Sequence, residues 1–69
     1  MNLHKMNAIA ASAYNVCGPR AGAFATPATI HQFDRALVVS CLAQYVAAHD
    51  GELFTRAEIE TTRNHFLKG

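Results

Sequence analysis

Apolar residues recur at helical spacing in three segments of the chain. In the first, residues 2–17, they follow one another every three or four positions, at Leu3, Met6, Ala10, Ala13 and Cys17. This spacing places them along one side of a helix. Asn2 can cap that helix, and Gly18-Pro19 can end it because proline has no N–H to donate. Since most of these residues are small, the side they form would let another helix approach closely.

The second segment, residues 27–49, is apolar around most of its circumference. Thr26 can serve as N-cap with Pro27 at the first helical position, and Asp50-Gly51 supplies a stop signal. Even Val39 and Ala43, on the side away from the main apolar line, are apolar. A helix apolar this far round has to be covered on more than one side, and two shorter helices cannot easily do that.

A second copy of the chain is the natural cover for such a helix, so the sequence predicts a homodimer. Its predicted interface comprises Ile30, Phe33, Leu37, Val38, Cys41, Leu42, Tyr45 and Val46. The orientation of the two copies stays open.

The third segment, residues 56–67, has a doubly specified start. Thr55 and Glu58 have the spacing of a capping box, and Phe54 with Ile59 has that of a hydrophobic staple. Opposite charges then follow at helical spacing, at Arg56, Glu60 and Arg63, and should pair on one face.

The predicted fold is therefore all-α: a single small helical domain over residues 1–69, with helices at roughly 2–17, 27–49 and 56–67 in a dimeric bundle. Residues 18–27 are predicted to form a loop, pinned to the core by Phe24. A chain of 69 residues buries only about 60% of its unfolded surface, so it needs dense packing or a partner to be stable.

Composition narrows the class of protein. The net charge of +1 supplies no broad basic surface for nucleic acid, and the apolar content argues against disorder. Cys17 and Cys41 are too few for a disulfide framework, which favours reduced thiols in the cytoplasm; whether they ever form a bridge stays open. The N-terminal apolar run is broken by Asn7, Ser12 and Asn15, so no signal peptide is predicted, and no run is long enough to span a membrane.

The sequence predicts neither a metal site nor a catalytic site. The histidines, His4, His31, His49 and His65, lack the short ligand pairs by which zinc sites are recognised, with or without the cysteines. Cys41 with His49 or His65 is the one candidate nucleophile and base, but Cys41 is predicted to lie in the core, where thiols are inert. We therefore expect no cofactor, no metal and no enzymatic activity.

The sequence instead favours a protein-interaction module: a homodimeric regulator, inhibitor or adaptor that binds another protein. Its predicted partner-binding residues are Arg35, Arg56, Glu60, Arg63 and Phe66. A subunit that is stable only within a larger complex is a further reading.

The alternative is a dimeric, helix-turn-helix-like DNA-binding regulator, with phosphate contacts from Arg56, Arg63, Asn64 and Lys68. Two features count against it. Glu58 and Glu60 on the same helix would repel phosphates, and the joint over residues 50–55 is longer than the usual tight turn.

Overall fold

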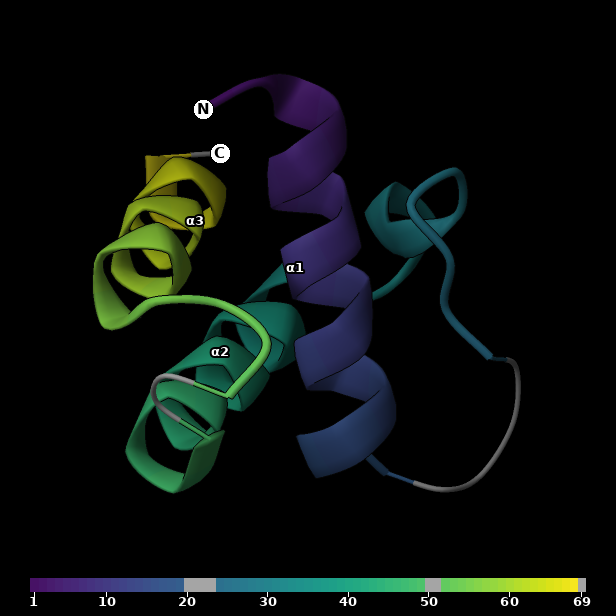
Figure 1. Cartoon of the computed structure of the whole chain (residues 1–69). Helices are drawn as coiled ribbons and strands as arrows, with labels where there is room; N and C mark the ends of the chain where they lie inside the picture. The colour runs from purple at the N-terminus through teal and green to yellow at the C-terminus, as the bar shows by residue number, and fades with distance from the viewer. Residues whose placement is uncertain (20–23, 50–51, 69) are drawn as a thin grey trace.

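The structure of the chain is a computed structural model, and it describes residues 1–19, 24–49 and 52–68 (Figure 1). It contains α1 (Leu3–Cys17), a short 3₁₀ helix η1 (Ile30–Gln32), α2 (Arg35–His49) and α3 (Arg56–Lys68). No strand occurs in these ranges. In the view of Figure 1, η1 lies to the right of α1 and α3 to its left, and α2 crosses behind α1. The prediction of an all-α, three-helix bundle is confirmed.

Helix α1 begins and ends where the sequence predicts. The Asn2 side chain accepts a hydrogen bond of 2.8 Å from the backbone N–H of Lys5. At the other end the Gly18 N–H donates to the Tyr14 carbonyl at 2.8 Å, and a Cβ on Gly18 would collide with that same oxygen. The middle of the predicted apolar side is buried, at Ala10 and Ala13, whereas Leu3 is exposed.

Helix α2 starts at Arg35, so the predicted start at residue 27 is wrong. Thr26 and Thr29 bond to one another instead: each hydroxyl accepts from the other residue's backbone N–H, at 3.2 and 2.9 Å. The chain then makes one turn of 3₁₀ helix and becomes extended at Phe33, with φ −94° and ψ 160°. The capping signal at Thr26 therefore forms a local turn rather than a long helix.

Asp34 is the residue that caps α2. Its carboxylate accepts hydrogen bonds from the backbone N–H groups of Ala36, at 2.9 Å, and Leu37, at 3.4 Å. These groups would otherwise lack a partner in the first turn. The predicted stop at Asp50-Gly51 lies outside the described residues, as do residues 20–23 of the predicted loop.

Helix α3 confirms the predicted capping box. The Glu58 N–H donates to the Thr55 hydroxyl at 3.1 Å, and the Thr55 N–H donates to the Glu58 carboxylate at 3.0 Å. The predicted pairing of Arg56 with Glu60 is also present, at 3.1 Å. Phe54, which precedes the cap, packs against the core that contains Ile59, in agreement with a hydrophobic staple.

One core joins the helices. Its buried side chains come from every element and are Ile9, Ala10, Ala11, Ala13, Ala25, Ile30, Val38, Cys41, Leu42, Tyr45, Ile59 and Phe66. Thr62 is buried among them and donates its hydroxyl to the Glu58 carbonyl at 2.8 Å. The described part of the chain leaves no buried side-chain polar atom without a hydrogen-bond partner.

Phe24 does not anchor the loop, so that prediction is wrong. Its side chain is 75% exposed, whereas its neighbour Ala25 is buried. The Asn15 side chain on α1 holds the loop: its amide donates to the Ala25 carbonyl at 2.8 Å and its oxygen accepts from the Ala25 N–H at 2.9 Å. A polar clamp on the backbone thus replaces the aromatic anchor.

Candidate functional site

The structure places much of the predicted dimer interface inside the chain's own core. Five of these residues are each at most 2% exposed: Ile30, Val38, Cys41, Leu42 and Tyr45. The other three, Phe33, Leu37 and Val46, are half-buried and pack against that core. A second copy of the chain could contact the five buried residues only if the core opened. Self-association itself stays a prediction, and an interface would have to use side chains outside this core.

The outer face of α2 lies opposite this buried side. At about 100° per residue, Ala36, Ser40, Ala43 and Ala47 align along it, and all four are exposed. Val39 and Val46 flank this stripe and are half-buried. From Ala36 through Val39 and Ala43 to Val46, the spacing of three, four and three residues is that of a helix seam. Between Arg35 and His49, the helix carries no charged side chain.

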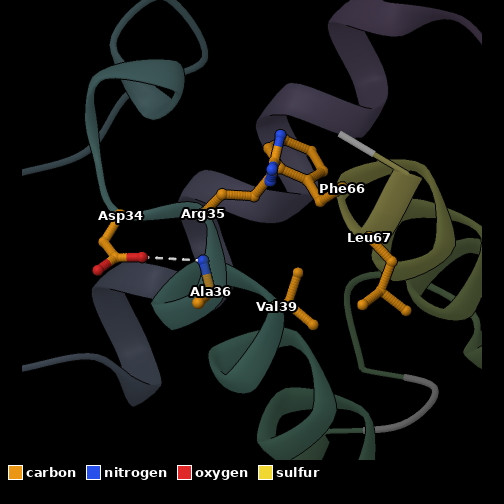
Figure 2. Close-up of a pocket in the computed structure, with 6 residues that line it drawn as sticks. All are labelled: Asp34, Arg35, Ala36, Val39, Phe66 and Leu67. Carbon is orange, nitrogen blue, oxygen red and sulfur yellow. Dashed lines mark hydrogen bonds between the residues drawn. The ribbon is translucent and has the colours of Figure 1, made fainter.

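A groove adjoins the outer face of α2 where the start of α2 meets the end of α3 (Figure 2). Its volume is about 440 Å³, and it is lined by Asp34, Arg35, Ala36, Val39, Phe66 and Leu67. Figure 2 shows the Arg35 side chain extending from α2 toward Phe66. Apolar side chains from two helices therefore form much of the wall, with a cation and an anion at the rim.

The predicted partner-binding residues fall into two groups. Arg35 and Phe66 come together in this groove, although Phe66 is only 5% exposed and belongs mainly to the core. Arg56 and Glu60 pair with each other near the start of α3, and Arg63 is half-buried. Leu67, which sequence reasoning missed, is 56% exposed and is the main exposed apolar side chain of the groove. Leu67 follows a helix face of alternating charges, and nothing in this pattern indicates that its side chain lines a groove.

Phe66 also connects three elements through contacts that the sequence did not indicate. Its ring stacks on the His31 ring of η1, with centroids 5.5 Å apart and planes 9° apart. The His31 Nε2 atom lies 3.0 Å from the Asn7 side-chain oxygen on α1. Residues this far apart in sequence share no periodicity, so pattern analysis cannot pair them.

A second groove, of about 390 Å³, lies between α1 and α3. It is lined by Met6, Thr61, Asn64, His65 and Lys68. Its polar walls offer a hydroxyl, an amide, an imidazole and an ammonium group, and no lining residue is acidic. Asn64 and Lys68 are two of the four residues predicted for phosphate contact; Arg56 and Arg63 lie on another side of α3.

Both acidic residues of α3 have basic partners. The Lys5 ammonium lies 2.6 Å from a Glu58 carboxylate oxygen, and Arg56 pairs with Glu60. The hydrogen bond from Lys5, together with the one from the Thr55 N–H, lowers the pKa of Glu58 from its usual 4.5. These ion pairs reduce the negative charge that α3 presents outward.

Burial raises the pKa values of Cys17, Cys41 and Tyr45. A raised pKa keeps a thiol protonated and therefore weakly nucleophilic at neutral pH. Across residues 1–19, 24–49 and 52–68, no three His, Cys, Asp or Glu side chains gather as metal ligands. Within the same ranges, none of the helices combines the length and the apolar character needed to cross a bilayer.

Comparison of the chain with known protein families, curated proteins and solved structures found no match. Its function therefore has to be inferred from its own residues and geometry.

Proposed function

We propose that this protein is a non-enzymatic protein-interaction module, a homodimeric regulator, inhibitor or adaptor that binds another protein and modulates its activity. The observation that carries the proposal is the uncharged, uncovered outer face of α2. The free thiols of Cys17 and Cys41 support a location in the cytoplasm, where disulfides are rare.

An exposed helix face without charged side chains departs from the usual pattern of a surface helix. Surface helices ordinarily alternate an apolar stripe toward the core with a polar, charged face toward water. After Arg35, the exposed positions of α2 carry no charge, and Val39 and Val46 flank them at one edge. They are Ala36, Ser40, Ala43, Gln44, Ala47 and Ala48. Contiguous apolar surface of this kind marks protein contact sites, because covering it removes apolar area from water.

The groove between α2 and α3 extends this apolar surface onto a second helix. Leu67 adds a large exposed side chain next to Val39. Arg63 lies one helical turn before Leu67, on the same side of α3, and Arg35 stands at the opposite rim. Two arginines beside an apolar groove suit a target segment with apolar anchors and acidic neighbours, since rim charges select partners.

Capture of the target from a cell extract by the immobilised protein tests this proposal. Wild type and an Ala57→Glu control should capture the same target, because Ala57 is exposed in the first turn of α3, ten residues before Leu67. The Leu67→Glu variant should lose it, because the substitution places a charge in the groove. Capture of identical proteins by all three would contradict the proposed docking surface.

DNA binding remains a second candidate because the acidic residues of α3 are paired. With Glu58 held by Lys5 and Glu60 held by Arg56, the outward face of α3 presents Thr61, Asn64 and Lys68. These side chains can donate hydrogen bonds to phosphate oxygens. The small net charge limits the affinity that such contacts would give.

Salt dependence distinguishes the two candidates. Phosphate contacts release counterions, so DNA affinity should fall steeply as salt rises and should weaken further in Lys68→Ala. An apolar protein contact should tolerate the same change in salt. Failure to bind any duplex at low salt would eliminate DNA binding.

A further inference from the structure

We propose that the groove between α1 and α3 binds the phosphate group of a small organic phosphate monoester. The groove has a volume of about 390 Å³, and Met6 of α1 lines it together with four polar residues of α3. It shares no lining residue with the groove between α2 and α3. The inference therefore goes beyond the proposed protein-interaction function, and it names a small ligand where the DNA candidate concerns a macromolecule.

The four polar residues lie on one face of α3. Asn64, His65 and Lys68 follow Thr61 by three, four and seven positions, which at about 100° per residue places all four within roughly a third of the helix circumference. Each of them is exposed, and all line the same groove. The second half of α3 thus directs its polar groups into one hollow beside α1.

These side chains form a set of hydrogen-bond donors. The Lys68 ammonium has three N–H donors and the Asn64 amide has two. The Thr61 hydroxyl and a ring N–H of His65 can donate as well. No lining residue is acidic. A phosphate monoester offers the complement, because at neutral pH it carries about −1.5 to −2 charges and three strong acceptor oxygens.

The ring of His65 is held against the core. It packs edge-on to the Phe66 ring, with centroids 5.5 Å apart and planes 78° apart, and Phe66 is itself buried. A side chain that is already positioned loses less freedom when it binds a ligand. His65 therefore supplies a fixed point in the groove, while the longer Lys68 side chain can adjust to the ligand.

The charges around the groove set the expected affinity. The acidic residues of α3 repel an anion little, because Glu58 is paired with Lys5 and Glu60 with Arg56. The carbonyl end of α3 carries a partial negative charge that opposes an anion, and His65 and Lys68 stand in that last turn. We therefore expect weak binding, in the millimolar range.

The size of the groove favours an ester over bare phosphate and over a DNA backbone. Its volume lies within the range of small-ligand sites, and the half-buried Met6 side chain offers a thioether for contact with an aromatic group. A duplex would need cations spread along its phosphates. Arg56 and Arg63 lie on the opposite side of α3 from Thr61 and Lys68, so the groove suits a single phosphate group.

An NMR titration of the isotope-labelled chain with phenyl phosphate at neutral pH tests the site. Saturable chemical-shift changes should concentrate at the lining residues, and potassium chloride at the same ionic strength should not produce them. Phenol, which lacks the phosphate, should not produce them either. Absence of saturable changes with phenyl phosphate, or equal changes and affinity with phenol, would overturn the proposed phosphate site.

Three surface variants locate the contact. Asn64→Asp keeps the shape of the side chain but replaces its donors with a carboxylate, so it should abolish the saturable changes. Lys68→Gln should weaken binding about 2- to 5-fold, as expected for the loss of one exposed charge contact. Arg56→Gln removes a positive charge from the opposite side of α3 and should bind like wild type. Circular dichroism should show the same helix content in all three, since these side chains are exposed.

Two results with these variants would overturn the site: unchanged affinity in Asn64→Asp, or equal losses in Lys68→Gln and Arg56→Gln, which would indicate an effect of overall charge. Competition then tests the source of the phosphate. A short DNA duplex at the same phosphate concentration should not displace phenyl phosphate. Displacement would assign the groove to a DNA backbone and overturn the small ligand.

Discussion

The Lys5 ammonium on α1 lies 2.6 Å from a carboxylate oxygen of Glu58 in the first turn of α3. The same carboxylate accepts the Thr55 N–H that closes the capping box. One side chain therefore serves both the local start of α3 and the packing of α3 against α1.

The pH dependence of folding should reflect this ion pair. Because the pKa of Glu58 is below 4.5 in the folded chain, its contribution is present at neutral pH and is lost as pH falls through that lowered pKa. Lys5→Met should move the Glu58 pKa back toward 4.5 and make stability less sensitive to acid. Carboxyl NMR titration of both proteins measures the shift, and an unchanged Glu58 pKa in Lys5→Met would contradict the contact.

Loss of the Thr55 hydroxyl should destabilise α3. Thr55→Ala removes the acceptor for the Glu58 N–H and should lower the free energy of unfolding by about 1 kcal/mol. Thr61→Ala, at an exposed position inside the same helix, serves as control and should not lower it, because alanine favours the helical conformation more than threonine does. Urea unfolding curves that coincide for wild type and Thr55→Ala would remove the capping box from the account.

Asp34 should matter more to α2 than Thr26 does. Asp34→Ala leaves the first-turn N–H groups of Ala36 and Leu37 without their acceptor and should cost about 1 kcal/mol. Asp34→Asn keeps an acceptor oxygen and should retain most of that stability. Equal unfolding free energies for wild type and Asp34→Ala would indicate that α2 starts elsewhere.

Substitution of two adjacent residues of α3, one in the core and one on the surface, should change stability by very different amounts. Phe66→Ala should cost about 3–5 kcal/mol, because its ring is buried and packs on His31. Leu67→Ala should leave stability almost unchanged, since Leu67 is largely exposed. Thermal unfolding measures both, and similar melting temperatures for the two variants would contradict the placement of Phe66.

Local signals in the sequence predicted the helix ends that depend on local chemistry. The Asn2 cap, the Gly18 end and the capping box at Thr55 each involve residues within a few positions of one another. The start of α2 was mispredicted because that prediction also relied on a local signal. Thr26 and Pro27 do carry a local signal, but it forms a turn, and Asp34 directly before the apolar run was the competing cap that the prediction overlooked.

Contacts between distant residues could not be predicted. Nothing in the sequence links Asn15 to the Ala25 backbone, His31 to Phe66, or Lys5 to Glu58. The all-round apolar character of α2 was visible, but periodicity alone could not tell which side the chain's own helices cover. The structure assigns the line through Val38 and Tyr45 to the core and leaves the line through Ala36 and Ala43 open.

The central claim is that the open side of α2 is a contact surface, and the melting temperature of the wild-type chain as a function of its concentration tests it most directly. Self-association through α2 predicts a melting temperature that rises with protein concentration, because association stabilises the folded state by mass action. A melting temperature that stays constant from micromolar to millimolar concentration would contradict self-association and show that the folded chain is stable with this face in water.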